Sequence, residues 1–282
     1  TFSGNSAGAG GGGMVHKGNG MVTLTNASFT DNYAPNGGGL NISQLNTALM
    51  FTLTDVTFSG NEATFGGGMY ITEKNTPALN EVTFSGNEAS NGGGMYIIGQ
   101  GAPTLNDVTF SDNVAFDDGG GIYTCESSTP TLTDVTFTGN SASSGGGMFN
   151  DMSKPTLENI TFIHNHAYRG GGIPNTASSN PVLSNISFFG NDATFGAGIY
   201  NYQSNPSLKN VTLSGNTAIN SGGGMYNRST SSPVVENAIL WGNSAPTGSE
   251  IYNNASTPTI SSSDVQGCMP GGVWKTACGT DG

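Results

Sequence analysis

Positive charge is scarce in this chain. Its 282 residues include seven Lys and Arg against 19 Asp and Glu, which gives a formal net charge of −12. Nucleic-acid binding requires clustered cations, so the composition excludes it, and it also argues against docking on anionic lipid. No apolar run reaches the ~18 residues of a transmembrane helix, so no membrane span is predicted. Acidic, lysine-poor chains rich in Asn, Ser and Thr are usual outside the cell, and we therefore expect an extracellular or cell-surface protein.

Cysteine is also rare, with Cys125, Cys268 and Cys278 in the whole chain. The last two lie in a Gly-rich tail and could close a small disulfide loop, which an oxidising compartment permits. Cys125 is then left without a partner.

Glycine, by contrast, is abundant at 45 residues. A flexible linker would share the glycine but would lack the Phe, Leu and Met that recur here at fixed intervals. Three sequence marks recur in phase: F-x-x-N, a glycine triplet followed by Met, Leu or Ile, and P-x-L. Successive Asn residues of the first mark are 25 to 29 residues apart. The chain is therefore a repeat protein.

Each repeat contains three short β-prone pieces, such as residues 131–132, 135–137 and 147–149, separated by Pro, Gly and Asn. No piece has the length or period of a helix, and propeller blades need about 40–45 residues. The sequence predicts an all-β, right-handed parallel β-helix (β-solenoid) of about ten coils of roughly 26 residues, with three short strands per coil. The repeat domain is expected over residues 1–260, followed by an irregular C-terminal cap or tail over 261–282.

Stacking of the coils places equivalent residues in columns about 4.8 Å apart. A single coil buries too little to fold alone, so stability must come from these columns. The Phe column is predicted to stack inside the rod, and the Asn column to bond along the axis at a turn. Their central members are Phe58, Phe84, Phe110, Phe137, Phe162 and Phe188, with Asn61, Asn87, Asn113, Asn140, Asn165 and Asn191.

An aromatic column follows the Met or Ile after the glycines. Because each ring is one residue from an inward apolar side chain, the rings are expected to point outward. They form either an exposed interaction stripe for a glycan, a protein or another copy, or a ladder covered by the loops of its own coils. The members are Tyr70, Tyr96, Tyr123, Phe149, Tyr200, Tyr226 and Tyr252, with Pro174 at the same place in one coil.

The paired F-x-x-N and G-G-[AILM] marks resemble the repeats of chlamydial polymorphic outer membrane proteins and related bacterial β-helix surface proteins. The resemblance covers residues 1–267, including the last copy from Ala238 to Gly267. It implies a right-handed parallel β-helix, displayed on a surface and adhesive in function.

Enzymatic activity is the main alternative, because some β-helix proteins cleave polysaccharides with clustered carboxylates and a nearby cation. The densest ionisable group is His164, His166 and Arg169, with Lys154, Asp151 and Glu158 in the same coil and Asp134 one coil away. The two His positions hold small or acidic residues in other coils, which is typical of solvated turn positions. We therefore predict no enzyme activity, no cofactor and no metal site.

Two further columns of residues each allow two interpretations. Asp55, Glu81, Asp107 and Asp134 form a carboxylate row that could bind Ca²⁺, although a hydrated outward row is favoured. Ranks of T-x-S and T-x-T, such as Thr109 and Ser111, resemble ice-binding solenoids. Thr is a common outward strand residue, however, and the ranks end at Ile163 and Phe189.

The sequence thus predicts an extracellular structural or adhesive β-solenoid, with a carbohydrate-active enzyme and an ice-binding protein as alternatives. Thr1 enters the repeat directly, whereas the other end carries the irregular tail with Cys268, Trp274 and Cys278. Two unlike ends on a regular rod predict end-to-end self-association into filaments. The alternative is that residues upstream of Thr1 supply an ordinary cap for this end.

Overall fold

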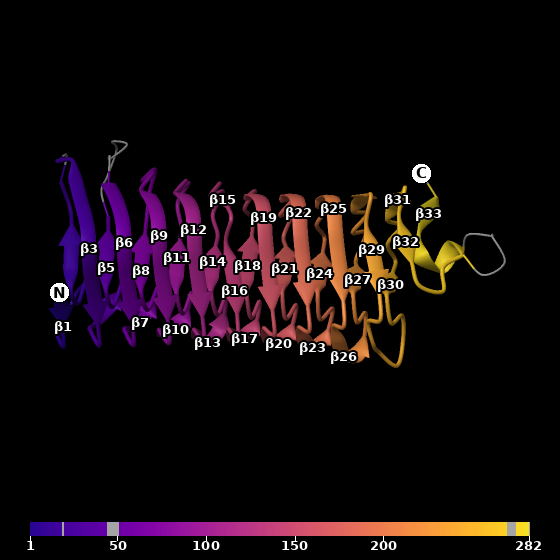
Figure 1. Ribbon diagram of the computed structural model, residues 1–282, viewed down its shortest axis with the longest axis horizontal. Helices are drawn as coiled ribbons and strands as arrows, with labels where there is room; N and C mark the ends of the chain where they lie inside the picture. The colour runs from indigo at the N-terminus through magenta and orange to yellow at the C-terminus, as the bar shows by residue number, and fades with distance from the viewer. Residues whose placement is uncertain (19, 44–50, 270–274, 282) are drawn as a thin grey trace.

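The protein is a rod of stacked coils, with strands β1 and β33 at opposite ends (Figure 1). The computed structural model describes residues 1–18, 20–43, 51–269 and 275–281, so the expected tail residue Trp274 lies outside the described residues. Three parallel sheets run the length of the rod, and the third has ten strands, one from each coil. The predicted parallel β-solenoid is confirmed. No helix among the described residues has the length and apolar character needed to cross a membrane.

The first sheet has 15 strands. They are β1 (Phe2–Ser3), β3 (Val22–Thr30), β6 (Phe51–Ser59), β9 (Ala78–Ser85), β12 (Thr104–Ser111), β15 (Thr131–Thr133), β16 (Thr136–Thr138), β19 (Thr156–Ile163), β22 (Val182–Phe189), β25 (Ser207–Ser214), β28 (Val234–Glu236), β29 (Ile239–Trp241), β31 (Thr259–Ser261), β32 (Asp264–Val265) and β33 (Thr280–Asp281).

The second and third sheets consist of shorter strands. The second contains β4 (Tyr33–Asn36), β7 (Glu62–Phe65), β10 (Glu88–Asn91), β13 (Val114–Asp118), β17 (Ser141–Ser144), β20 (His166–Arg169), β23 (Asp192–Phe195) and β26 (Thr217–Ser221). The third contains β2 (Met14–His16), β5 (Leu40–Ile42), β8 (Met69–Ile71), β11 (Met95–Ile97), β14 (Ile122–Thr124), β18 (Met148–Asp151), β21 (Ile173–Thr176), β24 (Ile199–Tyr202), β27 (Met225–Arg228) and β30 (Ile251–Asn254).

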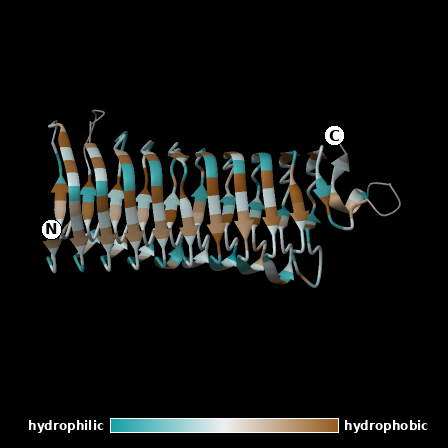
Figure 2. Ribbon diagram, in the orientation of Figure 1, coloured by the Kyte–Doolittle hydropathy of each residue, from teal (hydrophilic) through white to brown (hydrophobic). Residues whose placement is uncertain are grey.

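The core is a stack of phenylalanine rings. Register places Phe84 opposite Phe110 and Phe110 opposite Phe137. Ring centroids are 4.7 Å apart in the first pair and 5.0 Å in the second, with the planes nearly parallel. Hydrophobic and hydrophilic residues alternate along the long strands of the first sheet (Figure 2), as period-two burial requires. The whole Phe column is 0% exposed from Phe58 to Phe188, at Phe58, Phe84, Phe110, Phe137, Phe162 and Phe188.

A buried asparagine ladder lies at the turn between the first and second sheets. The backbone N–H and the side-chain amide of Asn87 both donate to Oδ1 of Asn113, at 3.1 and 2.9 Å. The same amide also donates to the carbonyl oxygen of Phe58, at 3.0 Å. The ladder ends at Asn243, which donates to the buried carboxylate of Glu250. Asn61, Asn87, Asn113, Asn140, Asn165 and Asn191 all belong to it.

A second buried asparagine ladder was not predicted. It begins where Thr124 donates to Asn150, and each following amide donates to the next coil at 2.8–2.9 Å, through Asn150, Asn175, Asn201, Asn227 and Asn253. The signal in the sequence is an Asn two residues after the Met or Ile of five successive coils. Earlier coils hold Ile42, Ile71 and Ile97 at this position, so the inner column changes from apolar to polar along the rod.

The glycine triplets form the corner between the second and third sheets. Gly92, the first of its triplet, has a φ of +66°, which glycine adopts without strain. At Gly94, the third, a Cβ atom would lie 2.6 Å from the carbonyl oxygen of Gly121 and 2.8 Å from the Phe110 ring. A side chain at Gly94 would therefore collide with the next coil and with the Phe column.

The carboxylate row lies at a bend within the first sheet. Asp55 and Asp107 are exposed and have φ values of +53°, a conformation that Asp and Asn tolerate better than other non-glycine residues. From Asp134 onward the row becomes an exposed ladder, in which each Asn amide donates to the preceding coil and Asp134 accepts the first bond. The donors are Asn159, Asn185, Asn210 and Asn237.

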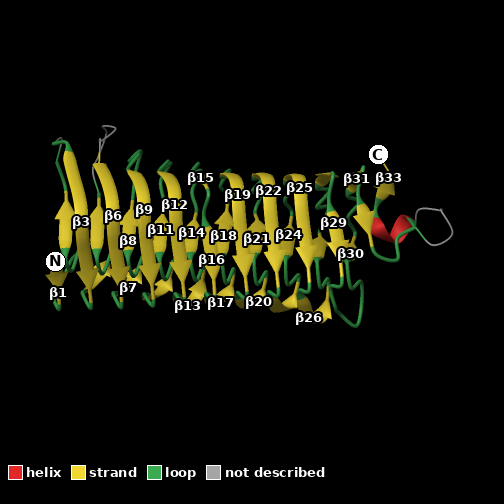
Figure 3. Cartoon of the chain, in the orientation of Figure 1, coloured by secondary structure: helices red, strands yellow, loops and turns green. Residues whose placement is uncertain are grey.

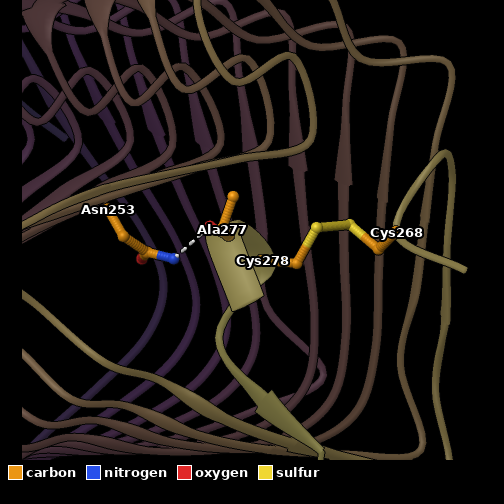
Figure 4. The surroundings of a disulfide bond; sticks show 4 residues. All are labelled: Asn253, Cys268, Ala277 and Cys278. Carbon is orange, nitrogen blue, oxygen red and sulfur yellow. Dashed lines mark hydrogen bonds between the residues drawn. A yellow bond between two sulfur atoms is a disulfide. The ribbon is translucent and has the colours of Figure 1, made fainter. Parts of the chain in front are cut away.

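The tail lies against the last coils. Cys268 and Cys278 are joined by a disulfide with a Cα–Cα distance of 6.0 Å, and both are part of the apolar core. The 3-10 helix η2 (Thr276–Cys278) precedes β33, which pairs with β31 (Figure 3). The carbonyl oxygen of Ala277 accepts the last amide of the second ladder, from Asn253, beside the disulfide (Figure 4). Cys125 is free and buried. End-to-end association stays a prediction.

Replacing Phe110 by Ala should lower the free energy of unfolding by about 3–5 kcal/mol, because it removes one ring from a stack that cannot collapse around the cavity. Thr109→Ala, on the outer face of the same strand, should change it by less than about 0.5 kcal/mol. Equilibrium urea denaturation measures both. Equal losses would show that the inward and outward positions have been exchanged.

Candidate functional site

The aromatic column lies outside the core but is largely covered. Tyr96, Phe149, Tyr200 and Tyr226 are 4–8% exposed, and Tyr70, Tyr123 and Tyr252 are half-buried. Neighbouring rings are 5.0–5.5 Å apart. These rings form a ladder rather than a freely exposed stripe.

The residues that cover the aromatic column come from the second sheet. The chain turns at the glycine corner, so that the ends of second-sheet strands lie beside the aromatic column. Phe65 at the end of β7 contacts Tyr96, with ring centroids 5.2 Å apart, and Phe195 at the end of β23 contacts Tyr226 at 5.8 Å. The rings are buried because the glycine corner turns the second sheet toward them. The spacing of residues in the sequence does not show the direction of this turn.

A cavity of about 410 Å³ opens in this corner. It lies where Pro174 replaces the aromatic ring that the neighbouring coils carry, between Phe149 and Tyr200. The full lining is Asp118, Ser144, Phe149, Arg169, Pro174, Thr176, Tyr200, Tyr202 and Arg228. A smaller cavity of about 160 Å³ shares Arg169, Tyr200 and Arg228 with it. We call the two together the arginine cleft.

The arginine cleft contains both arginines of the chain. Neither guanidinium forms an ion pair within the described residues. The ion pairs there join His166 to Asp192 and Lys209 to Glu236. Arg228 hydrogen-bonds the Tyr200 hydroxyl and lies 5.7 Å from the centre of the Tyr202 ring. Both arginine side chains are exposed and can reach a ligand.

Asp118 adds an ionisable group to the arginine cleft. Burial and, to a smaller extent, the charges of Asp117 and Asp151 together raise the pKa of Asp118 to about 6. A hydrogen bond with Ser144 and the charge of Arg169 act in the opposite direction. The net charge of the cleft therefore becomes more positive as the pH falls through 6.

The structure does not assemble the ionisable cluster considered from the sequence. His164 lies against Phe189 of the first sheet, with ring centroids 5.9 Å apart, whereas Arg169 lies in the arginine cleft. His166 pairs with the exposed Asp192 of the next coil. Glu158 and Asp134 belong to the first-sheet segments of their coils. Within the described part of the chain, no group of three or more His, Cys, Asp or Glu could hold a metal ion.

Sequence reasoning missed Asp118, Tyr202 and Arg228. A signal was present, because Arg169 and Arg228 are the only arginines and flank the aromatic column on opposite sides. Only the folded corner shows that these residues meet.

Comparison with known proteins supports the architecture. Residues 68–245 match the family model described as a right-handed β-helix region, which is more than half of the chain. No curated protein and no solved structure matches the chain. The resemblance to polymorphic outer membrane protein repeats stays a prediction.

Asp118→Asn should stabilise the protein at pH 8 and have little effect at pH 4. The folded pKa of about 6 exceeds the ordinary 3.8, so the unfolded state ionises first and stability falls as the pH rises through this window. Because Asp118 is partly exposed, the substitution should raise the free energy of unfolding at pH 8 by on the order of 1 kcal/mol. Urea denaturation at both pH values measures it, with exposed Asp107→Asn as the control. An equal effect of Asp118→Asn at pH 4 and pH 8 would contradict the assignment.

Proposed function

The chain belongs to the right-handed β-helix family, and we propose that it is a non-enzymatic extracellular rod that adheres to an anionic partner through the arginine cleft. The observation that carries this proposal is the position of the two arginines. In a chain of net charge −12, both line one cavity and neither is neutralised by a carboxylate ion pair within the described residues.

Electrostatics favours anion capture at this place. The surrounding acidic surface repels anions, so an anionic partner gains most where the guanidiniums of Arg169 and Arg228 face the solvent. Arginine is suited to this task because its planar fork can form two parallel hydrogen bonds with one carboxylate. The aromatic rings beside it supply apolar contact area.

The rod supports an adhesive role because it holds the arginine cleft on rigid elements. Arg169 ends β20 and Arg228 ends β27, and each strand is paired on both sides within its sheet. Sites built on paired strands keep their geometry without ordering a loop on binding, which lowers the entropic cost of association. The cleft also lies on the side of the rod, where a long partner has access.

The double variant Arg169→Gln/Arg228→Gln should bind an immobilised carboxymethyl dextran at least tenfold more weakly than the wild type at low salt. Unmodified dextran measures binding that does not depend on charge. Lys209→Gln is the matched control, because it removes one positive charge from an exposed pair on the first sheet. Surface plasmon resonance gives the affinities. Equal binding by the double variant and the wild type would refute the proposal.

A second function, a carbohydrate-active enzyme, is favoured by one observation. Asp118 has its pKa raised to about 6 and lies in the same cleft as Arg169, which is how a general acid beside an anionic substrate would be placed. Carboxylated oligosaccharides can be incubated with the protein between pH 5 and 8, with and without Ca²⁺, and analysed for new ends. Cleavage that Asp118→Asn abolishes would replace the adhesive function by the enzymatic one.

A further inference from the structure

The aromatic ladder is interrupted at a single coil within the repeat. Tyr123 and Phe149 are 5.1 Å apart, and Tyr200 and Tyr226 are 5.2 Å apart. Between these two groups stands Pro174, which pairs in register with Tyr200. Phe149 and Tyr200 are therefore two coils apart, or about 10 Å. A ring is missing from the ladder at the point where the larger cavity opens.

The cavity at this interruption has apolar and polar sides. Pro174 and the edges of Phe149 and Tyr200 form apolar walls, while Ser144 and Thr176 bring hydroxyl groups. Arg169 reaches the cavity from the coil of Pro174 itself, since it precedes the glycine triplet that leads into β21. A ligand at this place meets an apolar surface on one side and a guanidinium on the other.

We propose that the interruption at Pro174 is a seat for one sugar ring that carries a carboxylate. The ring lies over Pro174, against the edges of Phe149 and Tyr200, and its carboxylate binds Arg169. This inference rests on the proposed function, because it names the ligand class of the arginine cleft. The cavity volume of about 410 Å³ is in the range of small-ligand sites and is open to the side.

Each property of the seat selects one part of this ligand. The hydroxyl oxygens of Ser144, Thr176 and Tyr202 can accept hydrogen bonds from sugar hydroxyls, which a purely apolar ring could not supply. The planar guanidinium of Arg169 matches a carboxylate. The carboxylate of Asp118 repels a second negative charge, so a singly charged sugar is favoured over a doubly charged phosphate ester.

The decisive variant restores the missing ring. Pro174→Tyr gives this coil the residue found at the same position in most other coils, fills the seat and leaves both arginines in place. Val182→Tyr is the matched control, because it adds the same ring at an exposed position of β22, outside the seat. Glucuronate, glucose and glucose 6-phosphate are the probes, and ligand-observed NMR titration measures their binding.

Wild type and Val182→Tyr should bind glucuronate with affinities within threefold of each other, and Pro174→Tyr at least tenfold more weakly. Glucose and glucose 6-phosphate should both bind the wild type more weakly than glucuronate. Circular dichroism monitors folding, and Thr176→Phe, on the wall of the same cavity, is a second way to fill the seat if Pro174→Tyr does not fold.

Three outcomes separate the two proposals. Unchanged glucuronate binding by both filled variants would overturn the seat. Equal or tighter binding of glucose 6-phosphate would overturn its preference for a carboxylate. In the third outcome, the wild type binds carboxymethyl dextran, the double arginine variant does not, and the wild type does not bind glucuronate. That outcome would overturn the seat while supporting the arginine cleft.

Discussion

The distance between hydrogen-bonded parallel strands, about 4.8 Å, governs this molecule. It places every side chain directly against its equivalent in the next coil, so a column persists only if its residues pack well on copies of themselves. Phenylalanine does so by stacking, and asparagine does so because its amide both donates and accepts. A column of one charge repels itself and has to be exposed, as Asp55 and Asp107 are. This constraint explains why the inner columns keep one residue type over several successive coils, and why the carboxylate row lies on the outside.

The same constraint sets how much the sequence could predict. The Phe column and the first Asn ladder follow from residue types recurring at a fixed period. The disulfide follows from two Cys residues close together in the tail outside the repeat. The second Asn ladder is equally periodic, but the earlier coils hold Ile71 and Ile97 in the same column. Because the column changes residue type and the chain has many other asparagines, the pattern was not recognised. The arginine cleft could not be predicted, because it depends on the angle at the glycine corner. That angle directs Arg169 toward the aromatic column and leaves its sequence neighbour His164 on another face.

Function in a repeat rod depends on departures from the repeat. A perfectly regular column offers a ligand the same surface at every coil, so the ligand binds every coil with the same affinity and no single coil is preferred. The substitution of Pro174 for a ring, together with two arginines found nowhere else, gives one position its own shape and charge. Such a departure is tolerated on the outer columns, because the buried Phe and Asn columns continue through the same coils and hold them in register.

The amide ladders have a direction, as strings of aligned dipoles do. In both buried ladders the N–H groups point toward the C-terminal coils, and in the exposed ladder they point the other way. Each string ends, on its positive side, at a group that can only accept: Glu250, the carbonyl oxygen of Ala277, and Asp134. An anion at the positive end of aligned dipoles is stabilised just as an acidic residue is at a helix N-terminus. An Asn in place of the buried Glu250 would bring N–H groups of its own that need a further acceptor, so this carboxylate ends the first ladder.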